Sequence, residues 1–455
     1  MNLRLIIIAI VSTICFIGCK KDATEHNSLQ RGLTIQASTT TSTESASRTT
    51  FDGNVTKWVT GDEMTIMVSE SNTTPTSAHT FTCQDGQAGT FSNSTIELNP
   101  ECRYDFYAVY PTSTEEDATN FPTQITIGAA TQTQDGDSPA HIAQLDPLTG
   151  CVKNTLPNSV SIPMHHNAAV MAINIVNNLT TTFGIKSLDI IADDGIKLCG
   201  TYDIDIVSGE LSNPTNASNT ITVNVENSDT ISQDCTFKIY AAIAPCTLPQ
   251  NSTLKFVITD TDNIQYEFTK TFAAEFNIVA GDLLSTSFNL SAAETITYTA
   301  DFTSVPDGFP TSATAQTETK YYTFNGYNIG FYNKNGYAHS SGLNDVKYII
   351  FYSVGTTDTT SAKIYIPKIT GYKLSSLIVY GDAKQKHRLS VINGSTTVEL
   401  KGSLNNTTVT NKLLAKDTEI SLAESSDVIY LKIYAASSTL DYKCEGLSLK
   451  YTKSE

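Results

Sequence analysis

Short stretches in which apolar and polar residues alternate occupy most of this chain, for example residues 33–37, 169–176 and 254–258. Alternation of this kind places every second side chain on the same face of a strand. The stretches recur about every ten residues, with Asn, Asp, Gly and Pro between them, and almost none has the spacing of an amphipathic helix. The pattern predicts an all-β protein built from β-sandwiches.

One turn is clear enough to predict a hairpin. Residues 259–263 read Thr-Asp-Thr-Asp-Asn and separate the strand at 254–258 from a second alternating stretch at 265–268. The oxygen atoms of Asp260, Asp262 and Asn263 are also of the kind that calcium binds, but turn formation explains these residues better. No metal site is predicted.

Changes in composition divide the chain. A polar tether and a first strand are expected over residues 19–50, an N-terminal β-sandwich over 51–160 and a second β-sandwich over 161–292. The pattern breaks near Leu290, and beyond it seven of the 17 residues from Tyr321 to Tyr337 are aromatic. Residues 295–455 are therefore expected to form a separate jelly-roll-like sandwich.

The N-terminus has the features of a secretory signal peptide over residues 1–18. One arginine precedes an apolar run at residues 5–17, which is shorter than the roughly 20 residues that a membrane-spanning helix needs. Cys19 follows Phe16-Ile17-Gly18 and resembles the lipobox cysteine of bacterial lipoproteins, with Phe16 in place of the usual leucine. The resemblance implies acylation of Cys19 and anchoring in the outer membrane. An ordinary signal peptide with an incidental cysteine is the alternative.

Charge and cysteine content narrow the class of protein. The net charge of −17, with only 16% charged residues, argues against nucleic-acid binding, and 21 tyrosines in a Thr- and Ser-rich chain suit an extracellular β protein. Of the nine cysteines, seven remain once Cys15 leaves with the signal and Cys19 is acylated. Because no CxxC pair occurs, zinc is disfavoured and mostly buried thiols are expected, with their pairing left open.

Catalytic motifs are weak or missing from the sequence. We find no nucleophile elbow, phosphate loop or HExxH, so neither an enzyme nor a cofactor is predicted. His165 and His166 stand at the entrance to a strand and are expected to have no acidic or cysteine ligand nearby, which favours a structural role over metal binding.

Four stretches resemble the fimbrillin family, the subunits of type V pili. They are residues 48–66 (Arg-Thr, then Trp-Val-Thr-Gly-Asp), 104–111 (Tyr-Asp-Phe-Tyr-Ala-Val-Tyr-Pro), 162–170 (Ile-Pro-Met-His-His-Asn-Ala-Ala-Val) and 280–290 (Ala-Gly-Asp through Phe-Asn-Leu). Their order after a lipobox makes the resemblance fairly specific over about residues 33–290. It implies two transthyretin-like β-sandwich domains in tandem.

The resemblance also implies a mechanism of assembly. Members of the family are exported as lipoproteins and cut after an arginine, which releases the anchor and the first strand and lets a neighbouring subunit insert its own strand. Arg48, in a Ser/Thr-rich stretch, is the candidate cleavage site, and Leu33, Ile35 and Ala37 would be the inward residues of the strand that is lost. A cut at Arg31 would leave that strand in place. A role for Arg48 as a solvated loop residue is the alternative.

The C-terminal region departs from the pattern of stalk subunits, which end in a donor segment. About 160 residues follow the second sandwich here, which favours a tip or accessory subunit. The expected partners are other pilin subunits and a surface protein or glycan of a host or another bacterium, and the expected location is a fimbrium at the cell surface.

The aromatic cluster suggests a second function. Exposed rings can stack on sugars, and Tyr327, Tyr332 and Tyr337 are the candidate glycan-binding residues, although most rings of the cluster are expected in the core. The alternative to a pilus subunit is therefore a stationary outer-membrane lipoprotein that binds glycans. A surface hydrolase is a third and weak alternative, because no pair of catalytic carboxylates stands out.

Overall fold

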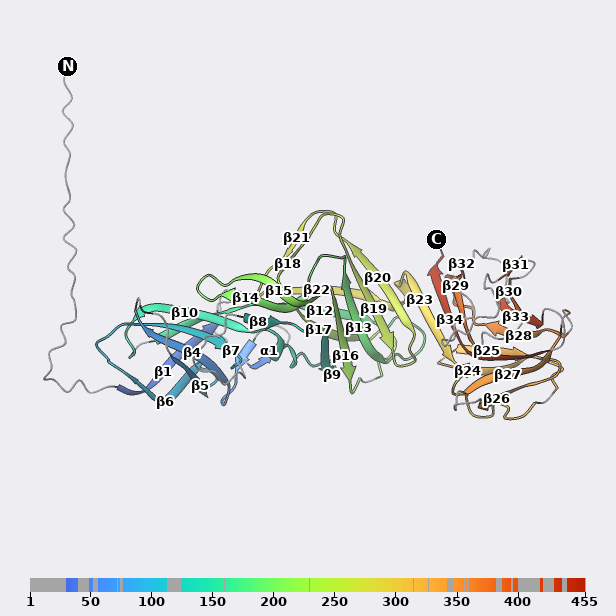
Figure 1. The fold of residues 1–455 in the computed structure, drawn as a ribbon, viewed down its shortest axis with the longest axis horizontal. Helices are drawn as coiled ribbons and strands as arrows, with labels where there is room; N and C mark the ends of the chain where they lie inside the picture. The colour runs from blue at the N-terminus through green and yellow to red at the C-terminus, as the bar shows by residue number, and fades with distance from the viewer. Residues whose placement is uncertain are drawn as a thin grey trace, which may run out of the picture.

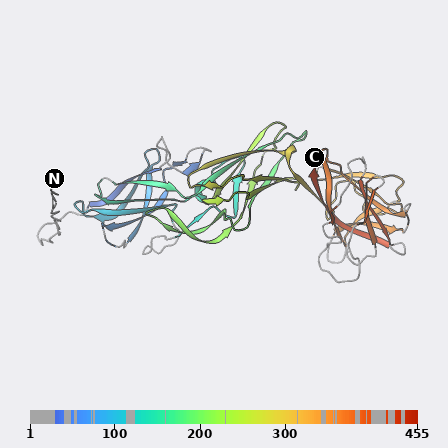
Figure 2. The ribbon, with the colours of Figure 1, turned by 90° about the horizontal axis from the view of Figure 1, so that it is seen from above.

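The computed structural model arranges the chain as three bodies in a row (Figures 1 and 2), in which the N-terminal body and the C-terminal body lie at opposite ends. The residues described are 30–39, 49–51, 56–71, 73, 77–112, 124–158, 160–228, 230–313, 315–325, 327–341, 347–355, 357, 360–381, 387–393, 396–399, 418–419, 429–435 and 440–454. Strands account for 64% of the structure and helices for 2%, which confirms the predicted all-β class.

The N-terminal body is a closed barrel with the strand order β1-β11-β10-β7-β4-β5-β6. A short ribbon of two further strands, β2 and β3, follows β1 in the chain. The strands are β1 (Gln30–Thr39), β2 (Thr49–Phe51), β3 (Thr56–Trp58), β4 (Glu63–Glu70), β5 (Ser77–Asp85), β6 (Thr90–Leu98), β7 (Tyr104–Tyr110), β10 (Leu148–Thr155) and β11 (Val160–His166). The barrel encloses its own apolar core, which includes Trp58, Phe81, Phe91 and Phe106.

The middle body contains a three-stranded sheet in the order β17-β12-β22. Its other strands are β13, β16, β19 and β20 of a longer sheet, the pair β14 and β15, and the pair β18 and β21. Its strands are β12 (Ala169–Val176), β13 (Ile185–Ala192), β14 (Cys199–Asp205), β15 (Glu210–Ser218), β16 (Thr220–Glu226), β17 (Thr236–Ile243), β18 (Cys246–Leu248), β19 (Thr253–Asp260), β20 (Gln265–Thr271), β21 (Phe276–Ile278) and β22 (Leu283–Asn289). β19 and β20 pair in antiparallel fashion across the turn at Asp260, which confirms the predicted hairpin.

Two strands cross the expected boundary between the first and second domains. β8 (Gln124–Ile127) and β9 (Thr131–Asp135) lie within residues 51–160, yet β8 pairs with β14 and β9 pairs with β16 of the middle body. A single helical turn, α1 (Ile142–Leu145), separates them from β10. The chain therefore enters the middle body, returns to complete the barrel and leaves again.

Two buried glutamines of β9 protect the edge of β17. The Gln132 amide donates to the Ala242 carbonyl at 2.8 Å and accepts from its N–H at 3.0 Å, as a neighbouring strand would. The Gln134 amide does the same with the Lys238 carbonyl and the Tyr240 N–H, both at 2.8 Å. These side chains satisfy edge groups that would otherwise be exposed to pairing with another chain.

The C-terminal body is a sandwich of two sheets. One has the order β24-β25-β28-β33-β30-β31, and the other contains β26, β27, β34, β29 and β32. The strands are β23 (Thr295–Asp301), β24 (Lys320–Phe324), β25 (Tyr327–Tyr332), β26 (Tyr337–Ser341), β27 (Lys347–Val354), β28 (Ala362–Ile366), β29 (Tyr372–Gly381), β30 (His387–Asn393), β31 (Thr396–Glu399), β32 (Thr418–Glu419), β33 (Ile429–Ala435) and β34 (Leu440–Lys453).

The middle and C-terminal bodies share a sheet. After the 3-10 turn η1 (Leu290–Ala292), β23 pairs with β20 over residues 295–297 and with β34 over its whole length. One apolar core runs from Ile173 of the middle body to Tyr451 of the C-terminal body. The boundary expected at residues 292–295 is thus a point where the sheet continues from one body into the next.

Candidate functional site: the first strand of the barrel

β1 closes the N-terminal barrel by filling the space between β6 and β11. It pairs with β6 in antiparallel register, for example Ile35 opposite Phe91, and with β11 in parallel register, Ile35 opposite Val160. A strand of this kind supplies main-chain partners to both neighbours at once. If it left, β6 and β11 would present two facing rows of unpaired N–H and C=O groups.

The inward residues of β1 are those predicted from the alternation. Leu33, Ile35 and Ala37 are 3%, 1% and 3% exposed. Thr34, Gln36 and Ser38, between and after them, point to solvent. Full burial of a Leu or Ile side chain stabilises a fold by about 1.5–3 kcal/mol, so these residues contribute both to the stability of the barrel and to the shape of the groove that they occupy.

The end of β1 nearest to Arg48 is held by a contact that sequence reasoning missed. The Ala37 N–H donates to the Gly89 carbonyl at 2.9 Å, and the Trp58 indole N–H donates to the Ala37 carbonyl at 3.1 Å. The Trp58 ring meets Phe91 and Tyr110 edge to face, with centroid separations of 4.8 and 4.9 Å. The available signal was Trp58 itself, because an indole N–H can only donate a hydrogen bond and needs an acceptor when it is buried.

Glycine is required at position 89 for this contact. Gly89 has φ of +60°, and a Cβ atom there would stand 2.4 Å from the Ala37 carbonyl oxygen. Any other residue would push β1 away from β6 at this point. The close approach gives the end of β1 a defined place against its neighbours.

The two candidate cleavage sites differ in their relation to β1. Arg31 lies within the strand, with its side chain 79% exposed and 3.3 Å from the Glu97 carboxylate. Arg48 lies outside the described residues, between the end of β1 at Thr39 and the start of β2 at Thr49. Cys19 also lies outside the described residues. The predicted roles of Cys19 and Arg48 stay predictions.

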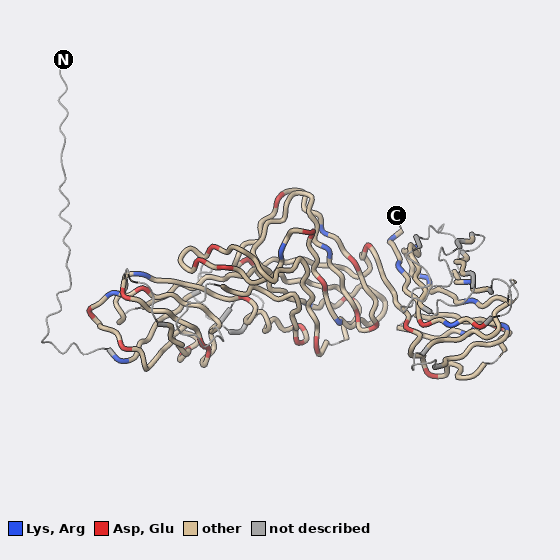
Figure 3. Tube along the Cα trace, viewed as in Figure 1, with Lys and Arg blue, Asp and Glu red and all other residues tan. Residues whose placement is uncertain are grey.

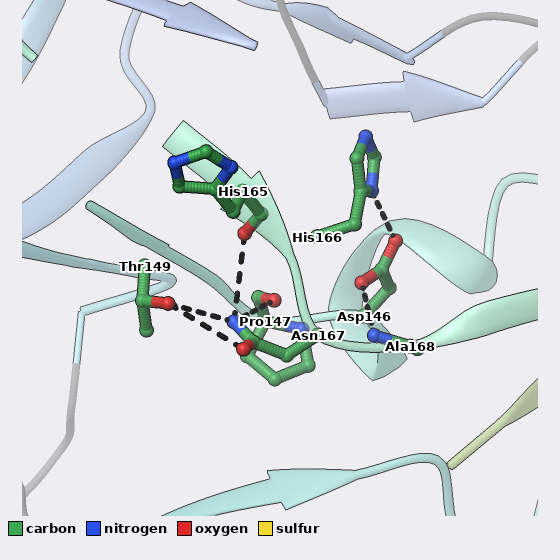
Figure 4. A network of polar contacts seen from close by, with 7 residues as sticks. All are labelled: Asp146, Pro147, Thr149, His165, His166, Asn167 and Ala168. Atoms are coloured by element: carbon green, nitrogen blue, oxygen red, sulfur yellow. Dashed lines mark hydrogen bonds and ion pairs between the residues drawn. The ribbon is translucent and has the colours of Figure 1, made fainter. Parts of the chain in front are cut away.

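The two histidines lie beside the junction of the barrel with the middle body, and one prediction about them was wrong. An acidic partner is present: the Asp146 carboxylate is 2.7 Å from Nδ1 of His166 and also accepts the Ala168 N–H at 3.0 Å (Figure 4). Asp146 was missed because it is 20 residues away in sequence and approaches His166 only when β10 and β11 pair. These contacts fix the passage from β11 into β12.

The neighbouring Asn167 completes this junction. Its amide donates to the Pro147 carbonyl at 2.9 Å and to the Thr149 hydroxyl at 3.0 Å (Figure 4). Among the described residues, no group of three or more His, Cys, Asp or Glu side chains could hold a metal ion. The contacts of Asp146 and Asn167 join the two bodies.

The three candidate glycan-binding tyrosines do not form one exposed platform. Tyr337 is 0% exposed and belongs to the core of the C-terminal body. Tyr327 is half-buried with its ring 4.9 Å from that of Tyr298, and Tyr332 is half-buried beneath the Lys363 ammonium. Their role in glycan binding stays a prediction, and the buried position of Tyr337 does not favour a part for it.

No disulfide joins the seven cysteines between residues 83 and 444, all of which are described. Cys83, Cys199 and Cys444 are buried, and burial raises the pKa of the Cys83 thiol to about 11. Within the described part of the chain, no helix has the length and apolar character needed to cross a membrane.

Comparison with known proteins identifies the family. Residues 43–320 match the model of the fimbrillin-like family, and because this match covers more than half of the chain, the chain belongs to that family. The family supports a structural and adhesive role at the cell surface, as a component of a fimbrium. A search of curated proteins finds no relative.

Solved structures of similar proteins were also found. They include proposed cell adhesion proteins from Bacteroides ovatus (14% identity, 59% of this chain and 95% of that chain, TM-score 0.41) and Bacteroides uniformis (14%, 60% and 97%, TM-score 0.38). A third is the tip fimbrial protein Mfa3 from Porphyromonas gingivalis with C-terminal truncation (11%, 52% and 81%, TM-score 0.27).

Proposed function

We propose that this chain is a tip or accessory fimbrial subunit whose barrel accepts a strand from a neighbouring subunit after cleavage at Arg48. The observation that carries the proposal is the place of β1. It closes the barrel with three buried inward residues, and it precedes the candidate cleavage site in the chain.

Cleavage at Arg48 would separate β1 from the rest of the barrel without breaking any other strand. The fragment up to residue 48 would contain β1 entire, and β2 would begin the mature chain. Loss of β1 would expose the apolar lining that now packs around Leu33, Ile35 and Ala37, together with the edges of β6 and β11. An incoming strand with the same alternation would restore both the burial and the main-chain hydrogen bonds.

The C-terminal body supports a terminal position. β34 is central in its sheet: over residues 446–452 it pairs with β23 on one side and β29 on the other. Its Leu447 and Leu449 side chains are fully buried. Withdrawal of β34 to act as a donor strand would unfold the C-terminal body, so this strand is needed within its own body.

The anchor belongs to the same proposal. Acylation of Cys19 would hold the precursor at the outer membrane, and the tether from Cys19 would run directly into β1. A cut at Arg48 would then release the protein from the membrane and open the acceptor groove in one step. A cut at Arg31 would release the protein but leave Leu33, Ile35 and Ala37 in the barrel.

N-terminal sequencing of the protein recovered from fimbriae tests this proposal. We expect the mature chain to begin at Thr49, and we expect Arg48→Ala to leave it membrane-bound and absent from fimbriae, while the conservative Arg48→Lys is still processed. Arg31→Ala is the matched control and should be processed normally. A mature chain that begins at Cys19 in purified fimbriae would contradict the proposal.

A stationary glycan-binding lipoprotein is the second candidate. One observation on the described surface of the C-terminal body favours it: the outward-facing rings of Tyr365 and Tyr430 lie side by side, with the Lys363 ammonium over Tyr430. In this case the protein stays at the membrane through Cys19, and unprocessed Arg48→Ala cells should retain full glycan binding without fimbrial association.

A further inference from the structure

Four adjacent strands of the C-terminal body carry a row of tyrosines on their outer face. The strands are β24, β25, β28 and β33, and their register places Tyr321 opposite Gly330, Gly330 opposite Tyr365, and Tyr365 opposite Tyr430. Tyr321 is 60% exposed, and Tyr365 and Tyr430 are half-buried. We call Tyr321, Tyr332, Lys363, Tyr365 and Tyr430 the tyrosine face.

The row is continuous because one position lacks a side chain. The ring centroids of Tyr321 and Tyr365 are 6.3 Å apart, and those of Tyr365 and Tyr430 are 5.3 Å apart. A Cβ atom on Gly330, which lies between them, would stand 2.7 Å from a ring carbon of Tyr321 and 3.0 Å from Cβ of Tyr365. Glycine therefore lets the two rings approach over β25.

A second row adds positive charge beside the rings. Tyr332 lies opposite Lys363, which lies opposite Lys432 on β33. The Lys363 ammonium is 5.7 Å from the ring centroid of Tyr332 and 5.2 Å from that of Tyr430. The Lys432 ammonium is 5.3 Å from the centroid of Tyr434. Contacts of this kind hold the lysines against the sheet.

The opposite side of the same strands is core. Ile329, Phe331, Ile364, Leu431 and Ile433 are all 0% exposed. Because successive residues of a strand point to opposite faces, the tyrosines and lysines between them point outward. Packing of the sandwich explains the inner set but does not require rings on the outer set.

The charge of these strands is the reverse of that of the whole chain. β24, β25, β28 and β33 contain no aspartate or glutamate, in a chain with a net charge of −17, and Lys363 and Lys432 lie on their outer face. Lys320 lies opposite the inward Phe331 and is paired with Glu318, so it does not belong to this face. Figure 3 shows Asp and Glu as well as Lys and Arg along the C-terminal body, but none of the acidic residues belongs to these four strands. A local excess of cations attracts an anionic ligand and lowers the affinity for a cationic one.

We propose that the tyrosine face binds an acidic oligosaccharide, that is, one with carboxylate or sulfate groups. Tyrosine rings offer flat apolar surfaces to the C–H faces of sugars, and the lysines are placed to pair with acidic groups beside them. Tyrosine is enriched in protein–protein interfaces, but lysine is depleted there, and an anionic membrane patch usually needs four to eight clustered cations. The two lysines therefore fit an acidic ligand better than either a protein partner or a membrane.

This inference deepens the adhesive role proposed above and is independent of strand exchange. The tyrosine face lies entirely on the C-terminal body, whereas β1 lies in the barrel at the other end of the molecule (Figure 1). Uncleaved Arg48→Ala protein should therefore bind the same glycans with unchanged affinity. Loss of glycan binding and loss of strand exchange would be separate results.

Titration calorimetry on the purified chain tests the proposal. The probes are octasaccharides of hyaluronan, chondroitin sulfate and alginate, with cellohexaose as the neutral comparison and polyglutamate as the polyanion without sugars. We expect at least one acidic oligosaccharide to bind at least tenfold more tightly than cellohexaose, with an affinity that falls as salt is added. Polyglutamate should bind at least tenfold more weakly than that oligosaccharide.

Variants locate the binding to the tyrosine face. Tyr365→Ala and Lys363→Gln should each weaken binding at least fivefold, and Gly330→Ala should weaken it by displacing the rings. Lys443→Gln is the matched control, because that lysine lies over the Tyr348 ring at 4.8 Å but on the other sheet. Circular dichroism of each variant checks that the body is folded.

Three results would overturn the proposal. The first is the absence of binding to all three acidic probes, and the second is equal binding to polyglutamate or cellohexaose. The third is equal loss of affinity in Lys443→Gln and Lys363→Gln, which would indicate general charge attraction instead of a site.

Discussion

The strands nearest to the two ends of the described chain, β1 and β34, look alike in sequence and differ in how they are held. Both alternate between buried and exposed residues: Leu33 and Ile35 in β1, and Leu447 and Leu449 in β34, are at most 3% exposed. β1 is paired with β6 and β11 and is followed at once by residues outside the described part. β34 pairs with three strands, β23, β27 and β29.

The two strands share an alternating sequence, but they differ in how many other strands depend on them for pairing. The proposed release of β1 would break its pairing with two strands that stay joined through the rest of the barrel. β34 lies between strands that have no other direct pairing with one another in the described sheet, and β23 connects it to the middle body. The predictions below test this contrast.

The largest effect is expected from a charge in β34. Leu449→Asp places an unpaired carboxylate at a side chain that is 0% exposed, which should cost more than about 4 kcal/mol and prevent the C-terminal body from folding. Limited proteolysis and near-UV circular dichroism would detect this. Thr452→Asp, on an exposed position of the same strand, should have little effect, and an intact body in Leu449→Asp would contradict a central role for β34.

A smaller effect, which depends on cleavage, is expected in β1. Ile35→Ala should lower the free energy of unfolding of the uncleaved chain by about 2–5 kcal/mol, because it leaves a cavity in the barrel. After a cut at Arg48 and loss of the fragment, the variant and the parent should be identical. Urea denaturation before and after cleavage measures both, with Gln36→Ala as the exposed control; a persistent difference after cleavage would mean that β1 stays bound.

The sheet that connects the middle body to β34 should lose stability as pH rises, because it contains Asp260 at the end of β19. Burial raises the pKa of the Asp260 carboxyl to about 7, while the Ile264 N–H, which donates to it at 2.7 Å, opposes part of this shift. The folded-state pKa lies above the unfolded value of about 3.9, so the folded protein holds this proton more tightly than the unfolded chain does. The stability that the protonated carboxyl contributes is therefore lost as pH rises from about 4 to 7.

The expected loss at Asp260 is about 2 kcal/mol between pH 5 and pH 7. Asp260→Asn keeps an acceptor for the Ile264 N–H and should remove this slope, as measured by urea denaturation at both pH values. Asp193→Asn is a control at an exposed carboxylate on the same body. An unchanged slope in Asp260→Asn would show that this carboxyl does not control the response.

The smallest effect is expected at the contact that holds the end of β1. Trp58→Phe removes the indole N–H that donates to the Ala37 carbonyl at 3.1 Å and keeps an aromatic ring, so it should destabilise the uncleaved barrel by about 0.5–1.5 kcal/mol. Hydrogen exchange of the β1 amides should accelerate accordingly. Equal acceleration in β34 would mean that the effect is not local to the barrel.

Much of the fold could be predicted because alternation is a local property of the sequence. The inward set of β1 and the β19–β20 hairpin follow from periodicity and turn residues alone. The crossing of β8 and β9 into the middle body could not be predicted, because the alternation of a strand does not say which sheet it joins. The Asp146–His166 contact escaped for the same reason.

The aromatic cluster shows where local reasoning ends. Tyr332 and Tyr337 belong to the same tyrosine-rich segment, yet Tyr332 faces the outer side of its sheet and Tyr337 is enclosed in the core. The rings that line up with Tyr321, those of Tyr365 and Tyr430, come from strands further along the chain and were not singled out. Only the pairing of β25, β28 and β33 brings these residues into rows.

The sequence by itself determined the all-β class, the family and the buried face of β1, because each depends on the order of residue types over a few positions. The tertiary structure alone decided that β1 closes a barrel, that β34 is a central strand and that a tyrosine face exists. These features arise from hydrogen bonds and packing between strands that are distant in the chain. The residues of one strand do not specify which strands will pair with it.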